Sequence, residues 1–76
     1  MKSINITLNS IEKVKNFVNI ISAYDGDFDL ASDRYVVDAK SIMGIFSLDL
    51  SKPLRLDIHS SETSGKLEEQ LKNFLS

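Results

Sequence analysis

Residues 38–58 read DAKSIMGIFSLDLSKPLRLDI, and this stretch decides the fold. Its first half is a short apolar run that begins after Ser41, and the turn-forming residues SKP at 51–53 end that run. Its second half alternates apolar and polar side chains. The pattern predicts a short helix over 41–47, with Ser41 at its start, followed by a half-buried strand over 54–58.

The sequence before this stretch predicts a strand followed by a helix. Residues 3–8 alternate apolar and polar side chains, which is typical of a half-buried strand. The sequence NSIE at 9–12 then forms a capping box with Asn9 as the helix N-cap. Apolar residues recur behind it at helical spacing as far as Ser22, so we expect an amphipathic helix with one face on a sheet.

Two more strands and a last helix complete the predicted domain. Strands are expected at 28–30 and 35–37, joined by a hairpin connection at 32–34. Residues 67–75 carry apolar side chains at helical spacing and predict a C-terminal helix. The order is β-α-β-β-α-β-α, which predicts an α+β fold with a four-stranded antiparallel sheet covered on one face by helices.

Composition places the chain among small globular proteins. Its 76 residues make a single domain, residues 1–76, with room for one core. It has no cysteine, which excludes disulfides and thiolate metal sites. A net charge of −2 without a basic cluster argues against nucleic acid as a direct partner. The sequence shows no signal peptide and no membrane span, so we expect a soluble, cytoplasmic protein. We also expect a monomer without a bound metal or cofactor.

The order of elements and residues 38–58 together resemble the phosphocarrier protein HPr family of the bacterial sugar phosphotransferase system. Residues 39–44, AKSIMG, match a family segment that follows the third strand and opens a short helix. In the family, a dedicated ATP-dependent kinase phosphorylates the serine of this segment, and the phosphoserine promotes binding to a transcriptional regulator. The resemblance implies an HPr-like open-faced sandwich, a regulatory phosphorylation site at Ser41, and an HPr kinase and a transcriptional regulator as protein partners.

The histidine that carries the phosphoryl group in the family has no counterpart in this alignment. Phe17 and Ser41 align with their family counterparts without a gap between them. The histidine position then falls on Ser10, the arginine position on Glu12 and the proline position on Lys13. A serine phosphoester is too stable to be a good relay, and Glu12 would repel the phosphate that the arginine neutralises. We therefore expect no catalytic residue and no enzymatic activity.

His59 is the only histidine in the sequence, and the predicted sheet separates it from Ser10. In the family, the first and fourth strands are antiparallel neighbours, so the start of the fourth lies beside the end of the first. His59 then lies at the far end of this pair. We expect it to be a solvent-facing strand residue without a catalytic role.

The short helix carries two apolar faces. Ile42 and Ile45 share one face, and Met43 and Phe46 share another. The family places the first pair inward and the second near the partner, and methionine and aromatic side chains suit such surfaces. We therefore expect Lys40, Met43 and Phe46 to contact a partner. The open alternative is that Met43 and Phe46 only cover the edge of a small core.

Three functions remain open at this point. The first is a regulatory, protein-binding module that does not relay phosphoryl groups and is controlled by phosphorylation of Ser41. The second is an active phosphocarrier of the phosphotransferase system that uses an unusual acceptor such as Ser10. The third is a fold relic with an unrelated protein partner, in which Ser41 is no more than a helix cap.

Overall fold

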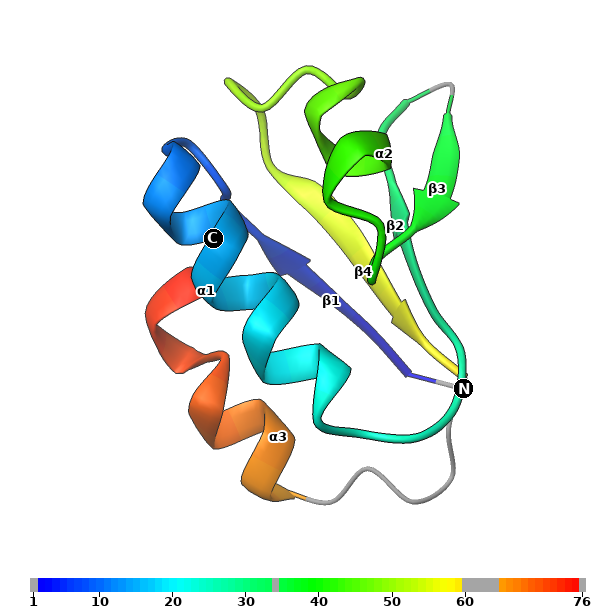
Figure 1. Cartoon of the computed structure of the whole chain (residues 1–76), viewed down its shortest axis with the longest axis vertical. Coiled ribbons are helices and arrows are strands. Elements are labelled where there is room, and N and C mark those ends of the chain that lie inside the picture. The colour runs from blue at the N-terminus through cyan, green and yellow to red at the C-terminus, as the bar shows by residue number, and fades with distance from the viewer. Residues whose placement is uncertain (1, 34, 60–64, 76) are drawn as a thin grey trace.

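The computed structural model describes residues 2–33, 35–59 and 65–75 of the chain (Figure 1). The strands are β1 (Lys2–Ile6), β2 (Phe28–Ala31), β3 (Val36–Asp38) and β4 (Leu54–Ile58). The helices are α1 (Ile11–Ser22), α2 (Ile42–Phe46) and α3 (Gly65–Gln70), and a 3-10 turn, η1 (Lys72–Phe74), follows α3. Within these described ranges, no helix has the length and apolar character needed to cross a bilayer.

The four strands form one antiparallel sheet in the order β1-β4-β2-β3. β4 is a central strand: its Leu54 pairs with Ile6 of β1, and its Ile58 pairs with Phe28 of β2. The helices cover one face of this sheet and leave the other open (Figure 1). The structure therefore confirms the predicted α+β open-faced sandwich and the antiparallel pairing of the first and fourth strands.

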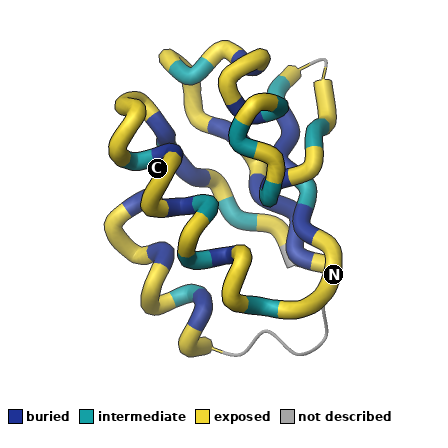
Figure 2. Tube along the Cα trace, in the orientation of Figure 1, coloured by how far each residue is buried: buried dark blue, intermediate teal, exposed yellow. Residues whose placement is uncertain are grey.

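The core lies where the apolar side of the sheet meets the helices. Buried and exposed positions alternate along the helices, as expected when one face of each packs on a sheet (Figure 2). The Phe17 ring of α1 packs edge-on against the Phe74 ring of η1, with centroids 6.1 Å apart and an interplanar angle of 68°. This contact ties the C-terminal turn to the first helix.

The first helix begins one residue later than the capping box predicts. Ser10 is the N-cap in place of Asn9: its backbone is extended, and its Oγ accepts a hydrogen bond from the Lys13 amide at 3.2 Å. β1 also ends earlier than expected, at Ile6. Leu8 is nevertheless fully buried. The alternation over residues 3–8 therefore correctly indicates which side chains point into the core, although the strand pairing stops at Ile6.

The predicted C-terminal helix over 67–75 is interrupted after Gln70. The reason is a long-range backbone contact, because the Thr7 amide beyond the end of β1 donates a hydrogen bond to the Phe74 carbonyl at 2.7 Å. A continuous helix would point that carbonyl along its own axis, so the chain leaves the α-helix and forms η1 first. The third strand is shifted by one residue from the prediction, to Val36–Asp38.

Asp57 departs from the predicted alternation of β4, which put it on a solvated polar face. It is only 9% exposed. The Ser3 hydroxyl of β1 donates to Asp57 Oδ1 at 2.6 Å, and Arg55 Nε donates to the same oxygen at 3.0 Å. These two bonds offset the cost of removing the carboxylate from water.

Candidate functional site

The turn between β3 and α2 presents Ser41 to solvent. The Ser41 amide donates to the Asp38 carbonyl at 3.0 Å, and the Asp38 side chain accepts from the Lys40 amide at 2.9 Å. Ser41 is exposed and has extended backbone angles, and its Oγ accepts from the Gly44 amide at 3.2 Å. It is the N-cap of α2, as the sequence predicts.

Gly44 leaves room for the close approach of the Ser41 hydroxyl to the helix. A Cβ at residue 44 would lie 3.3 Å from Ser41 Oγ and 3.4 Å from Val37 Cβ. The first distance is tighter than most Cβ contacts and the second is an ordinary van der Waals contact, so a side chain at residue 44 would push the capping oxygen by a few tenths of an ångström. The pattern of serine followed three residues later by glycine therefore has a steric reason in this fold.

The two apolar faces of α2 differ in burial in the way that the family resemblance implies. Ile45 is fully buried and Ile42 is half-buried, whereas Met43 is 77% exposed and Phe46 is 41% exposed. Exposed large apolar side chains on a short helix form a surface that a partner can cover. Their use in partner binding stays a prediction.

The start of α1 lies beside the end of α2, and together they enclose a shallow pocket. Asn9 and Ser10, just before α1, line it together with Ile11 of α1 and Phe46 of α2. Leu50 and Ser51, in the loop after α2, complete the lining. Ile11 is 63% exposed and extends the apolar area around Phe46.

We call the residues Ser10, Ile11, Met43, Phe46 and Leu50 the α1–α2 surface. The sequence indicated Ser10, Met43 and Phe46 as residues of interest. It did not indicate Ile11 or Leu50, because each was interpreted only as an apolar residue in or near a helix. Their shared surface depends on the packing of α1 against α2, which no local pattern reveals.

Neither serine has the partner that a nucleophile requires. In the part of the chain that the structure describes, Ser10 Oγ and Ser41 Oγ accept bonds from backbone amides and contact no histidine or carboxylate. Their hydroxyl groups therefore lack a general base. Among the same residues, no group of three histidine, aspartate or glutamate side chains is placed to hold a metal ion.

His59 lies far along the sheet from Ser10, as expected. It follows β4 at the end where Ile58 pairs with Lys2, while Ser10 lies beyond the opposite end of β1. Its Nε2 is 2.8 Å from Asp29 Oδ2 on the neighbouring strand. The ring is thus held on the open side of the sheet by a carboxylate that the sequence did not pair with it.

Lys40 is directed to a different part of the fold from the α1–α2 surface. Its Nζ donates to the Tyr24 carbonyl at 2.7 Å and lies 5.3 Å from the centre of the Phe28 ring. These contacts anchor the α1–β2 loop. The expectation that Lys40 contacts a partner remains a prediction.

Comparison with known proteins supports the fold. No protein-family model matches the sequence, and no curated protein matches it either. Among solved structures, the chain is similar to HPr-C-His from Thermoanaerobacter tengcongensis, with 26% identity, a TM-score of 0.78, and coverage of 96% of this chain and 89% of that chain.

It is also similar to the phosphocarrier protein HPr from Bacillus anthracis str. Ames, with 23% identity and a TM-score of 0.71. That match covers 99% of this chain and 94% of the other. Both likenesses span nearly the whole chain. The chain therefore has the HPr-like fold.

Proposed function

We propose that this chain is a protein-binding module related to the sugar phosphotransferase system, which does not relay phosphoryl groups and is controlled by phosphate on Ser41. One observation carries the proposal: α2 holds Met43 and Phe46 exposed on its surface and has the exposed Ser41 hydroxyl at its start. A hydroxyl group that can be phosphorylated therefore adjoins the exposed apolar side chains of Met43 and Phe46, which we call the docking area. The HPr-like fold supports a role among the proteins of that system.

The residues at the N-terminus of α1 argue against phosphoryl relay. The resemblance assigns the acceptor position to Ser10, whose exposed hydroxyl caps the helix and has no general base among the described residues. Glu12 occupies the first turn, where its carboxylate would repel a phosphate bound at the helix start. The free amides of that turn favour an anion, but they do not supply the reactive nitrogen that a relay needs.

A phosphate on Ser41 would act on the docking area by charge. It would add about −1.5 to −2 charges at neutral pH and strong acceptor oxygens beside the first amides of α2. The same modification would place this charge next to Met43, at the edge of the apolar area. A partner with a basic residue at that edge would then bind the phosphorylated form more tightly.

Intact-mass spectrometry tests the proposal directly. The protein is incubated with HPr kinase and ATP, and separately with phosphoenolpyruvate and the upstream phosphotransferase. We expect one phosphate from the kinase, its loss in Ser41→Ala, and its retention in the matched control Ser47→Ala, which removes the exposed serine at the opposite cap of α2. Absence of kinase labelling in the wild type would overturn control through Ser41.

A second candidate function is phosphoryl acceptance by Ser10. It is favoured by the position of Ser10 in the pocket shared with Ile11 and Phe46, where a docked donor would reach its hydroxyl. Labelling from phosphoenolpyruvate that persists in Ser41→Ala and disappears in Ser10→Ala would establish this function. Labelling in neither reaction would leave an unrelated protein partner as the remaining function.

A further inference from the structure

Lys40, the residue before Ser41, connects the turn that leads into α2 to the end of α1. Its Nζ donates to the Tyr24 carbonyl at 2.7 Å and lies 5.3 Å from the centre of the Phe28 ring. The side chain is half-buried, and among the described residues its ammonium group forms no ion pair with a carboxylate. A charged group next to the proposed phosphorylation site is therefore directed into the fold.

The Tyr24 carbonyl lies at the C-terminal end of α1, where a positive charge is favourable. Ala23 is the C-cap of the helix, and the Tyr24 amide donates to the Ile21 carbonyl at 3.1 Å. α1 has no basic residue of its own in its last turn. The ammonium group of Lys40 therefore supplies, from a distant part of the chain, the charge that the negative end of the helix dipole favours.

Tyr24 extends this connection to α3. Its hydroxyl donates to Gln70 Oε1 at 2.5 Å, while its carbonyl accepts from Lys40. Residues 25–27, which follow Tyr24, are exposed, and Gly26 has a φ of 105°. Loss of the Lys40 contact would therefore loosen the end of α1 and weaken the hold of Tyr24 on α3.

The Lys40 side chain is the part of the turn that can respond to a change at Ser41. The backbone is held, because Asp38 Oδ1 accepts from the Lys40 amide at 2.9 Å and the Asp38 carbonyl accepts from the Ser41 amide at 3.0 Å. The lysine side chain is a flexible four-carbon stem on the neighbouring Cα atom, about 3.8 Å away. Its present acceptor is a neutral carbonyl, whereas a phosphate on Ser41 would carry about −1.5 to −2 charges. Attraction between full opposite charges favours the phosphate.

We propose that phosphate on Ser41 draws the ammonium group of Lys40 away from the Tyr24 carbonyl, and thereby loosens the end of α1 and its contact with α3. This link rests on the phosphorylation of Ser41 proposed above. It adds a second region, residues 23–27, that changes with the modification and lies outside the docking area. A partner that recognises either region can then distinguish the two forms of the protein.

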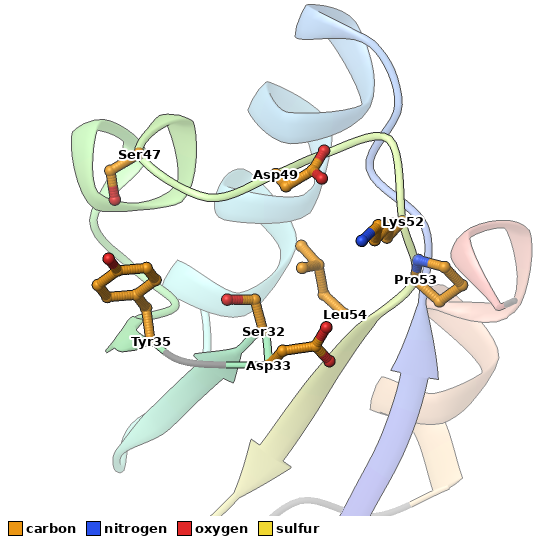
Figure 3. A pocket seen from close by; sticks show the side chains of 8 residues that line it. All are labelled: Ser32, Asp33, Tyr35, Ser47, Asp49, Lys52, Pro53 and Leu54. Carbon is orange, nitrogen blue, oxygen red and sulfur yellow. The ribbon is translucent and has the colours of Figure 1, made fainter.

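Two full-length proteins with phosphoserine built in during synthesis test this link without a kinase. One carries phosphoserine at residue 41, and the matched control carries it at residue 47, the C-cap of α2. Ser47 lies beside Tyr35 at a hollow of about 310 Å³, between the β2–β3 connection and the loop after α2 (Figure 3). Lys40 lines a different hollow, beside Phe28. The control thus adds the same charge to the same helix, away from Lys40.

Lysine side-chain NMR of the isotope-labelled proteins measures the contact directly. A coupling across the hydrogen bond between Lys40 Nζ and the Tyr24 carbonyl carbon is expected in the unmodified protein and in the control, and its loss is expected with phosphate on Ser41. The amides of Ala23 and Tyr24, which donate to carbonyls in the last turn of α1, should then exchange about tenfold faster than in the control. A coupling that survives phosphate on Ser41, or that is absent from the unmodified protein, would overturn the link.

Lys40→Met shows whether the effect passes through Lys40. Methionine keeps an unbranched apolar side chain near the Phe28 ring and removes the ammonium group. Without phosphate, the Ala23 and Tyr24 amides of this variant should exchange as fast as those of the wild type with phosphate on Ser41, and the phosphate should change them little. Equal acceleration by the phosphate in wild type and in Lys40→Met would assign the effect to another route.

The kinase experiment and these measurements can fail independently. Because the phosphoserine is built in, absence of kinase labelling would reject control through Ser41 and leave the NMR result as it is. An undisturbed contact between Lys40 and Tyr24 in the protein with phosphate on Ser41 would reject the link and leave the kinase result as it is.

Discussion

The hydroxyl of Ser3 on β1 donates a 2.6 Å hydrogen bond to the carboxylate of Asp57 on β4, a residue 54 positions later in the chain. This bond is the main cause that lowers the pKa of Asp57 below its ordinary value. Burial acts in the opposite direction, and the hydrogen bond and charge of Arg55 add to the lowering. The open face of the sheet thus holds a carboxylate that favours its ionised form.

Replacement of Ser3 by alanine should destabilise the fold in a pH-dependent way. Because the folded pKa of Asp57 is depressed, its contribution is present above the unfolded pKa and is lost as the pH falls through the folded pKa. We expect Ser3→Ala to cost about 1–2 kcal/mol of unfolding free energy at neutral pH. Denaturant unfolding should show the two proteins converging in strongly acidic solution.

The matched control for Ser3→Ala is Asn5→Ala, on the next outward position of β1. Asn5 makes no side-chain hydrogen bond to a described residue, so its removal should leave the pH dependence unchanged. An equal loss of stability for Ser3→Ala at neutral and acidic pH would show that the Asp57 carboxylate is not the cause.

Substitution of Gly44 by alanine should fail to stabilise α2, although alanine usually favours a helix by about 1 kcal/mol over glycine. The added methyl group would lie 3.3 Å from Ser41 Oγ and disturb the cap. Removing that oxygen relieves the contact, so Gly44→Ala should be better tolerated in a Ser41→Ala background. A double-mutant cycle of unfolding free energies measures this coupling.

Gly65→Ala is the control for Gly44→Ala, because a Cβ at residue 65 would have no atom within 4 Å. It should be neutral or mildly stabilising. Ser41→Ala alone should cost about 1 kcal/mol as a lost N-cap, whereas Ser41→Asp should retain most of the stability. Additive effects of the Gly44 and Ser41 substitutions would contradict a steric conflict between them.

Met43 should matter for binding and not for stability. Met43→Ala removes a side chain that is 77% exposed, so its unfolding free energy should stay within about 0.5 kcal/mol of the wild type. Ile45→Ala, on the buried face of the same helix, should cost about 2–5 kcal/mol of unfolding free energy.

Binding to a transcriptional regulator that recognises phosphorylated HPr is then compared for Met43→Ala and wild type, both phosphorylated by the kinase. Unchanged affinity would exclude Met43 from the interface.

Histidine at position 10 should not by itself create a phosphocarrier. The imidazole of Ser10→His would supply the acceptor nitrogen, but Glu12 would still oppose the phosphate in the first turn of α1. The double variant Ser10→His with Glu12→Arg should accept label from phosphoenolpyruvate and the upstream enzyme several times faster. Acid-labile phosphate, detected by mass spectrometry, is the measurement. Equal rates in the single and double variants would show that Glu12 is not the obstacle.

Local sequence patterns predicted the parts of the structure that local forces determine. Ser41 was predicted to be an N-cap, because serine at an extended residue before an apolar run has a short-range reason to cap. Helical spacing separates the face of Ile45 from the face of Met43, and the family resemblance implied that the Ile45 face points inward, as the structure shows. The α+β class likewise followed from the order of elements.

The features that the sequence did not predict depend on partners far along the chain. Asp57 was expected in solvent, yet Ser3 and Arg55 make its burial tolerable. The C-terminal helix was expected to continue, yet the Thr7 amide draws the Phe74 carbonyl out of it. The hollow beside Tyr35 combines residues from two separate connections, so no contiguous motif could have indicated it.

The central position of β4 has a consequence for the order in which the chain can fold. β1 and β2 both pair with β4 and not with each other, although they are the first two strands to be synthesised. β1 has no sheet partner until Leu54–Ile58 has emerged, when more than two thirds of the 76 residues have already been made, and until then β2 can pair only with β3. Nascent chains that end before residue 54 should therefore form at most the β2–β3 pair, and on the ribosome the four-stranded sheet should assemble in one late step.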